Sequence, residues 1–147
     1  MYLIDTNVIS EARKGANTDP GVTDFFSRLT TEQIPAYLSV VTVGELRRGV
    51  ELIRHRGDTR QAEVLAFWLD EILDQYAGNI LPLDAEAAQV WGRLRVPHPE
   101  HELDKQIAAI ALINGLTVVT RNTADFTGTG TGVNLLNPFR LLGQTPS

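Results

Sequence analysis

Four acidic residues stand at positions where carboxylates could carry out chemistry. Asp5 directly follows a short apolar run, and Glu45 lies in the first turn of an expected helix. Asp104 begins another expected helix, and Asp125 lies in an expected loop. Taken singly, each has an ordinary explanation as a helix cap, a dipole-favoured acid or a loop acid. Together they predict a metal site, because crowded carboxylates repel one another strongly unless a cation lies between them.

The available ligand atoms indicate which metal the site would bind and which reaction it would catalyse. The chain has no cysteine, which excludes a thiolate zinc site, a disulfide scaffold and a cysteine nucleophile. Hard oxygen ligands favour Mg²⁺, with Mn²⁺ as the alternative. Such ions activate water and stabilise charge on a phosphodiester, so we predict a metal-dependent phosphodiesterase. In this interpretation Asp5, Glu45 and Asp104 hold the main metal. Asp125 orients the attacking water or a second ion.

Two other groups of residues are weaker candidates. His98 and His101 flank Pro99, and zinc would need further ligands, so we interpret this segment as a surface turn, with metal binding the less favoured alternative. The run from Gly128 to Gly132 lacks the lysine and the following helix of a phosphate-binding loop. We therefore expect that run to be a flexible connection.

The apolar pattern predicts the elements that must position the four acids. We expect strands at 2–4, 36–41, 80–83, 117–119 and 133–136. We expect helices at 6–14, 20–29, 43–56, 62–76, 85–94 and 103–114. Strands that alternate with helices imply an α/β fold with a parallel sheet of four to five strands and helices on both faces. Pro82 indicates an edge or the end of a strand.

The expected topology brings the acids together. No internal repeat or long linker divides the sequence, so residues 1–147 are expected to form a single domain. In such sheets ligands bind outside the carboxyl ends of the strands. Asp5, Glu45 and Asp125 each follow an expected strand, and small residues at Ala108 and Ala111 leave room beside Asp104. We therefore expect all four carboxylates at one edge of the sheet.

The formal net charge of −5 argues against a nucleic-acid substrate, because nucleic-acid binders are more often basic. Setting aside the four proposed ligands leaves −1, so phosphate contacts would have to come from local basic patches. Arg47, Arg48 and Arg54 follow Glu45, and a phosphate-binding role and a solvated helix face are equally open for them. Arg121, near Asp125, is a second candidate.

The sequence shows no secretory signal and no apolar run near the ~20 residues that span a bilayer. We therefore expect a cytoplasmic protein that does not associate with a membrane.

The residues around the four acids resemble the motifs of PIN-domain ribonucleases. The similar segments are Leu3–Ser10, Ser39–Leu46, Asp104–Ala109, Thr120–Phe126 and the closing Asn137–Phe139. They run in the family's order along nearly the whole chain, and they are most similar to VapC and FitB-type toxins of bacterial toxin–antitoxin pairs. Any one motif is weak, but the series is specific.

The resemblance implies a compact PIN-like fold, Mg²⁺-dependent endoribonuclease activity on RNA, a homodimer or a larger toxin–antitoxin assembly, and a cognate antitoxin that blocks the site. It maps the catalytic, metal-binding carboxylates onto the four acids. Four supporting polar residues follow from the same motifs: Thr6, Asn7, Thr120 and Asn122. Lys105 departs from the family pattern and either neutralises part of the cluster or points to solvent. The segment Val96–Glu102 has no match.

Two rival functions stay open. A non-catalytic interaction module would keep the acids as a metal-stabilised scaffold. A phosphatase would use Asp5 as its nucleophile, although Asp5-Thr6-Asn7 lacks the second aspartate of an Asp-x-Asp motif. Metal-dependent RNA cleavage that is lost in single-acid variants would separate the ribonuclease from the scaffold.

Overall fold

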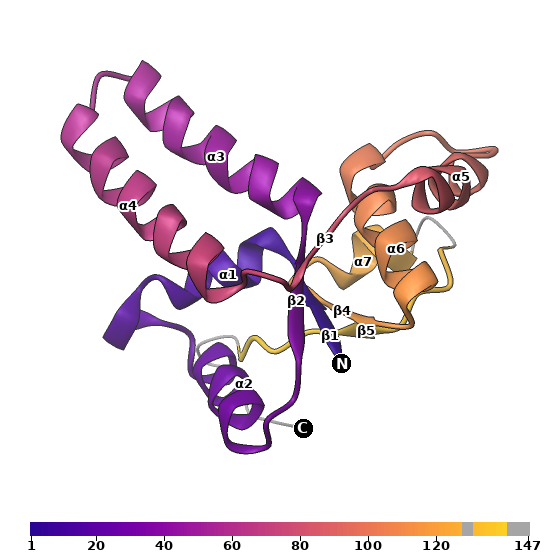
Figure 1. Ribbon diagram of the computed structural model, residues 1–147, viewed down its shortest axis with the longest axis horizontal. Coiled ribbons are helices and arrows are strands. Elements are labelled where there is room, and N and C mark those ends of the chain that lie inside the picture. Colours follow the sequence, from indigo (N-terminus) through magenta and orange to yellow (C-terminus); the bar gives the residue numbers. More distant parts are fainter. Residues whose placement is uncertain (128–130, 141–147) are drawn as a thin grey trace.

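The computed structural model describes residues 1–127 and 131–140. Within them, five short strands form a parallel sheet in the order β3-β2-β1-β4-β5 (Figure 1). The strands are β1 (Tyr2–Ile4), β2 (Ala36–Ser39), β3 (Ile80–Leu81), β4 (Thr117–Val119) and β5 (Leu135–Leu136). The predicted parallel sheet is confirmed, and Pro82 follows an edge strand as expected.

Seven α-helices connect these strands within the described residues. They are α1 (Thr6–Ala12), α2 (Pro20–Thr31), α3 (Val40–His55), α4 (Thr59–Gln75), α5 (Ala85–Leu94), α6 (Glu102–Asn114) and α7 (Thr123–Thr127), with a 3-10 turn at Gly15–Asn17. Asp19, Asp58 and Asp84 cap three of them, because each side chain accepts a hydrogen bond from a backbone N–H in the first turn. Gly115 ends α6 in the left-handed conformation, which glycine adopts without strain.

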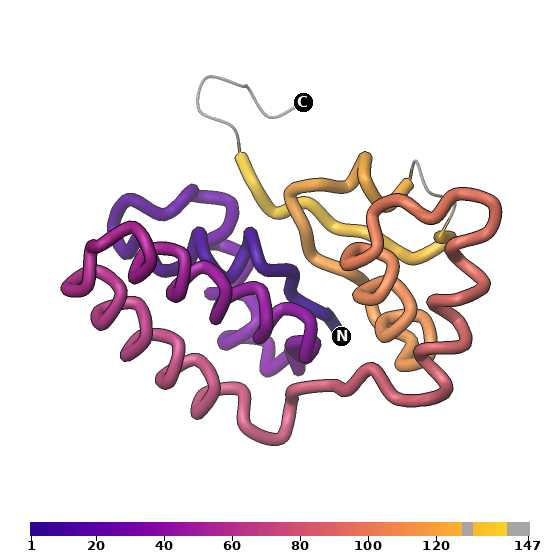
Figure 2. The backbone as a smooth tube through the Cα atoms, turned by 90° about the horizontal axis from the view of Figure 1, so that it is seen from above, coloured from indigo at the N-terminus to yellow at the C-terminus, as the bar shows by residue number. Residues whose placement is uncertain are grey.

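The sheet separates two packed layers. Successive strand residues point to opposite faces, so Ile4 joins one apolar cluster and Leu3 the other. Helices α1 to α4 cover one face and α5 to α7 the other, which confirms the predicted arrangement (Figure 1). Within these layers α3 packs along α4, and α5 packs along α6, forming two arms. The chain passes from the α3–α4 arm to the α5–α6 arm through β3 (Figure 2).

The closing segment is fastened to the start of α2. A Cβ added to Gly21 would overlap the carbonyl oxygen of Pro138, so glycine is required for this close approach. The Arg140 backbone N–H also donates to Asp19 Oδ1 at 2.9 Å, and the Arg140 guanidinium lies 2.6 Å from Asp24.

Some predicted boundaries were wrong, for identifiable reasons. The β-branched run suggested a strand to Val41, but the strand ends at Ser39, whose hydroxyl accepts a hydrogen bond from the Thr42 N–H and caps α3. Glu45 therefore lies in the second turn of α3 and not in the first. The expected strands at 80–83 and 133–136 are each shortened to two residues, and α1 ends at Ala12.

Asp125 lies on the short helix α7, where a loop was expected. Residues 128–130 of the expected flexible run lie outside the described residues, as do residues 141–147 of the predicted domain. No helix in the described part of the chain is long and apolar enough to cross a membrane.

Candidate active site

Asp5 is held by three elements at the carboxyl edge of the sheet. Its backbone N–H donates to the Val119 carbonyl of β4 at 2.9 Å, and its Oδ1 accepts from the Thr6 N–H at the start of α1 at 2.8 Å. Its Oδ2 accepts from the Thr120 hydroxyl at 2.8 Å and from the Asn7 amide at 3.4 Å. The residue is only 4% exposed. Burial raises the pKa of Asp5, and the hydrogen bonds from Thr120 and Thr6 reduce that rise.

A small polar network fixes the orientation of the Asp5 carboxylate. The Thr120 hydroxyl, which donates to Asp5, accepts from the Asn122 backbone N–H at 3.1 Å and from the Asn7 amide at 3.3 Å. The Asn7 side-chain oxygen in turn accepts from the Arg121 backbone N–H at 3.0 Å. The structure therefore brings the predicted supporting residues together. Asn122 contributes its main chain to this network, and its side chain is exposed.

Glu45 reaches the same edge from α3. Its Oε1 accepts from the Thr6 hydroxyl at 3.0 Å, and Thr42 lies 3.5 Å from that hydroxyl. Burial raises the pKa of Glu45. The nearby negative charge of Asp5 adds to the rise, whereas Thr6 and the Arg48 guanidinium oppose it. Sequence reasoning missed Thr42 and Ser39, both fully buried, which support this end of α3.

Asp104 is the carboxylate whose pKa is raised furthest, to about 6. Burial is the largest cause, followed by the negative charges of Asp5, Asp125 and Glu45. The four predicted acids therefore lie close enough to repel one another, although they come from four separate segments of the chain. Ala108 and Ala111, on the same face of α6, are fully buried as expected.

His101 was interpreted from the sequence as part of a surface turn, yet it lies beside Asp104. Its Nδ1 is 3.8 Å from Asp104 Oδ2. His101, Asp104 and Asp125 each offer one ligand atom, and these three atoms lie within 4.8 Å of one another. The spacing of three residues between His101 and Asp104, at the start of a helix, is a signal that could have indicated this.

The chemistry of these side chains fits a divalent cation. Carboxylate oxygens are the ligands that Mg²⁺ and Mn²⁺ take, and a cation among them would offset the repulsion that raises the pKa of Asp104. The Thr6 hydroxyl donates to one oxygen of Glu45, and both oxygens of Asp5 accept hydrogen bonds, so these two carboxylates are each restrained by neighbouring groups.

Comparison with known proteins identifies the fold family. The sequence profile of the PIN domain matches residues 2–129. The chain belongs to the PIN-domain family. It is 37% identical to toxin FitB of Neisseria gonorrhoeae over 132 residues, covering 86% of this chain and 91% of that protein. It is 32% identical to the VapC ribonuclease Y4jK of Sinorhizobium fredii over 144 residues, covering 95% and 98% of the two chains.

Solved structures agree with this assignment. The crystal structure of FitAcB from Neisseria gonorrhoeae has 36% sequence identity and a TM-score of 0.80, and the match covers 96% of this chain and 100% of that one. The predicted resemblance to PIN domains is therefore confirmed by sequence and by structure.

The candidate arginines of this PIN domain occupy three different settings. Arg48 is exposed and close enough to Glu45 to lower its pKa. Arg47 and Arg54 both pair with Glu51, at 3.7 and 3.3 Å, along the exposed face of α3. Arg121 follows β4 beside Asn7, and its guanidinium lies 4.8 Å from the centre of the Phe139 ring. Of these four, Arg48 is the one that lies near a carboxylate of the cluster.

Lys105 does not point to solvent. It is fully buried, and its ammonium donates a hydrogen bond to the main-chain carbonyl of His98. The solvent-facing alternative was therefore wrong. The side chain instead ties the segment before α6 to the helix.

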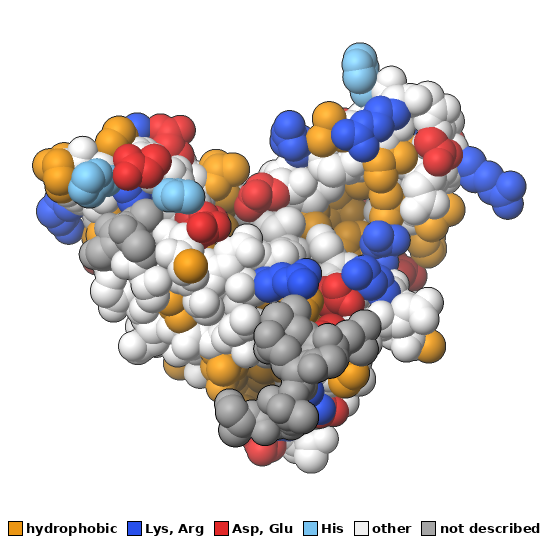
Figure 3. Space-filling view, turned by 180° about the vertical axis from the view of Figure 1, so that it is seen from behind, with side chains coloured by type: hydrophobic (Ala, Val, Ile, Leu, Met, Phe, Trp, Pro, Cys, Tyr) orange, Lys and Arg blue, Asp and Glu red, His pale blue; other side chains and the backbone are white. Residues whose placement is uncertain are grey.

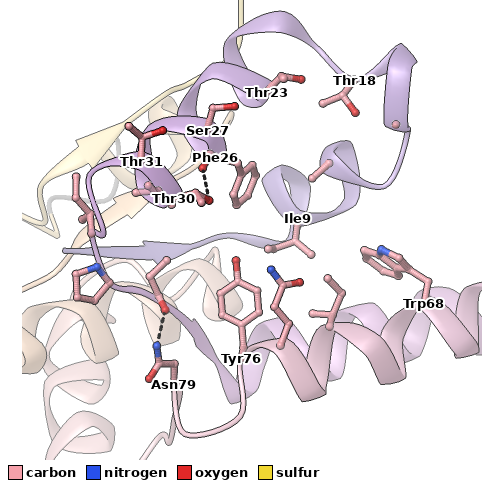
Figure 4. A pocket seen from close by; sticks show the side chains of 18 residues that line it. Ile9, Thr18, Thr23, Phe26, Ser27, Thr30, Thr31, Trp68, Tyr76 and Asn79 are labelled. Atoms are coloured by element: carbon pink, nitrogen blue, oxygen red, sulfur yellow. Dashed lines mark hydrogen bonds between the residues drawn. The ribbon is translucent and has the colours of Figure 1, made fainter.

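The surface of the molecule is hollowed between the two arms (Figure 3). Figure 3 shows the notch between the two arms of the molecule, with acidic side chains on either side of it. A separate groove of about 900 Å³ lies between α2 and α4, and its walls include Ile9, Phe26, Trp68 and Tyr76 (Figure 4). None of the four acids lines that groove. An open notch suits an extended substrate better than a small enclosed one.

The raised pKa of Asp104 predicts a pH-dependent stability. The pKa of Asp104 is about 6 in the folded protein and near 3.9 in an unfolded chain, so the folded protein binds the carboxyl proton more tightly. The stabilisation that protonated Asp104 contributes is fully present below about pH 4 and is lost as the pH rises through about 6. We expect metal-free protein to lose on the order of 2 kcal/mol of unfolding free energy from this group across that range. Denaturant titrations in EDTA at several pH values would measure the loss.

Asp104→Asn should remove most of this dependence, because the amide does not titrate. Asp58→Asn is the matched control, since Asp58 caps α4 at an exposed position and asparagine caps equally well. If the Asp104→Asn and wild-type stabilities ran parallel between about pH 4 and pH 7, the carboxylates would not be electrostatically crowded.

Proposed function

We propose that this PIN domain is a Mg²⁺-dependent endoribonuclease, with Mn²⁺ as an alternative ion, and the toxin of a toxin–antitoxin pair acting in the cytoplasm, where its RNA substrate is found. The observation that carries the proposal is the gathering of four acids at one edge of the sheet: burial raises the pKa of Asp104, and the negative charges of Asp5, Asp125 and Glu45 add to the rise. The relatives named toxin FitB and VapC ribonuclease support it.

The proposed roles follow from the contacts of each side chain. Asp5, Glu45 and Asp104 would hold the main ion, with Asp125 orienting the attacking water or contacting a second ion. A bound divalent ion would activate water and offset charge on the phosphodiester. Thr120 and Asn7 keep the Asp5 carboxylate in one orientation, and Thr6 does the same for Glu45. Two of the proposed ligands, Asp5 and Glu45, are therefore pre-oriented before an ion or a substrate arrives.

Replacing Asp104 tests the proposal most directly. Asp104→Asn keeps the shape of the side chain but loses its charge, so we expect Mg²⁺-dependent RNA cleavage to fall at least about 100-fold, since even a residue that only supports a metal ligand commonly contributes 10–100-fold. A further Asp5→Asn should add little, because the acids act as one unit. Cleavage of labelled RNA by purified protein measures both effects, and Asp58→Asn should cleave like wild type.

The same variants provide a readout without substrate. Mg²⁺ at ~100 times its dissociation constant should stabilise the wild type by roughly 2.7 kcal/mol and Asp104→Asn far less. Full cleavage by Asp104→Asn would contradict the catalytic assignment. Metal stabilisation without cleavage in the wild type would favour the non-catalytic scaffold instead.

RNA contacts are proposed for the arginines that flank the notch, and the ion pairs of Arg47 and Arg54 make Arg48 the better candidate on α3. In the Asp104→Asn background, which leaves RNA uncut, Arg48→Gln should flatten the dependence of log binding constant on log salt by ~0.7 for each phosphate that Arg48 neutralises. Arg54→Gln is the matched control and should leave the slope unchanged. Fluorescence anisotropy with labelled RNA measures the slopes. Equal slopes for Asp104→Asn with and without Arg48→Gln would mean that Arg48 is a solvated surface residue that does not contact RNA.

The partners proposed are a second copy of the chain and a cognate antitoxin. Because Glu45, Asp104 and Asp125 are part-exposed, the acid cluster suits a guanidinium, which supplies positive charge and forked donors. We expect the antitoxin to place an Arg or Lys side chain near Asp5 and Asp104, in competition with metal. In a purified complex, exchanging that side chain for Gln should restore Mn²⁺ binding and RNA cleavage. An inhibited complex that binds Mn²⁺ as well as the free protein does would contradict this.

A further inference from the structure

His101 is held beside Asp104 by an anchored turn. It is the first residue before α6, and its backbone is left-handed at φ 58° and ψ 48°. Its side chain makes no capping hydrogen bond to the helix and is 43% exposed, so its ring is not committed to capping α6. Its Nδ1 faces Asp104 Oδ2 at 3.8 Å.

Several contacts fix the turn that carries this histidine. The buried Lys105 ammonium donates to the His98 carbonyl, and the Lys105 backbone N–H donates to the His101 carbonyl at 3.0 Å. Arg95, which lies over the Trp91 ring, pairs with Glu102 at 2.6 Å and ties the end of α5 to the start of α6. The position of His101 beside Asp104 is thus built into the junction of α5 and α6.

The spacing of the ligand atoms matches a shared cation. Ligand atoms about 2.1 Å from one ion lie ~3.0 Å apart when adjacent and ~4.2 Å apart when opposite. The nitrogen–oxygen distance of 3.8 Å lies between these values, and the three atoms of His101, Asp104 and Asp125 are within 4.8 Å of one another. Since 4.8 Å exceeds the ~4.2 Å between opposite ligands, the most widely spaced atoms would have to approach each other by up to ~0.6 Å around a cation.

We propose that His101 is a nitrogen ligand of a cation position formed with Asp104 and Asp125, and that it biases this position toward Mn²⁺ and other transition ions over Mg²⁺. The inference rests on the part of the proposed function that places a cation at Asp104. Imidazole is a good ligand for transition metals, whereas Mg²⁺ is held mainly by oxygen and retains its water. The four-carboxylate pattern alone carries no such preference.

A direct spectroscopic test separates coordination from a simple ion pair. Electron spin-echo measurements on Mn²⁺-loaded protein should show modulation from a coordinated nitrogen in the wild type. His101→Gln should lose that modulation. His98→Gln is the matched control and should retain it, because the His98 ring pairs with Glu100 at 3.4 Å and only its main-chain carbonyl contacts Lys105.

Metal titrations give the second readout. His101→Gln should weaken Mn²⁺ binding about 10-fold, in the range found when a residue that supports a metal site is replaced, and change Mg²⁺ binding less than about twofold. Absence of nitrogen modulation in the wild type, or equal weakening for Mn²⁺ and Mg²⁺, would overturn the inference.

These outcomes are distinguishable from failure of the proposed function. Mg²⁺-dependent RNA cleavage without nitrogen modulation would leave the ribonuclease proposal intact and remove His101 from the metal site. Nitrogen modulation without any RNA cleavage would keep His101 in the metal site and contradict the ribonuclease proposal.

Discussion

The hydrogen bond from the Thr120 hydroxyl to the buried Asp5 carboxylate joins the parts of the structure on which the site depends. Asp5 directly follows β1, its backbone N–H bonds to Val119 of β4, and its carboxylate caps α1, so one residue fixes how two strands and a helix meet. Thr6, the next residue, then holds Glu45 of α3. Such charge-assisted bonds contribute on the order of 1.5–3 kcal/mol each, yet the pKa of Asp5 remains raised. The negative charge of the buried Asp5 therefore remains unfavourable in the folded site, and a proton or a cation can relieve this electrostatic cost.

That cost is concentrated where the two layers of the fold meet. Glu45 comes from the layer of α1 to α4, whereas Asp104 and Asp125 come from α6 and α7 on the other face. The repulsion between them acts across the sheet edge and opposes the approach of the two arms. A cation held by acids of both layers would reverse the sign of this interaction, so metal binding would stabilise the arrangement of the arms as well as the ligands themselves.

Much of this arrangement could be predicted because its signals are local. Asp5 after an apolar run and Asp104 ahead of a small-residue helix face both indicate acids at a sheet edge. Other features depend on contacts that spacing does not reveal. Nothing in the Asp104-Lys105 pair indicates that the lysine is buried against the His98 carbonyl, seven residues earlier. The helix α7 is too short to show a helical periodicity in the sequence. Ser39 is followed by β-branched residues that favour a strand, which hides its role as the cap of α3.

The net charge of −5 constrains how an anionic substrate could be accepted. Without a cation, the four carboxylates would repel each phosphate that entered the notch. Of the candidate arginines, Arg48 on α3 lies near Glu45, whereas the Arg121 guanidinium lies against the Phe139 ring. Under the proposed function they would attract neighbouring phosphates of a polymer, and a bound ion would offset the charge of the phosphate between the acids. Under the proposed function, an ion must occupy the cluster before the scissile phosphate can approach, so the carboxylates set the order of binding as well as the chemistry.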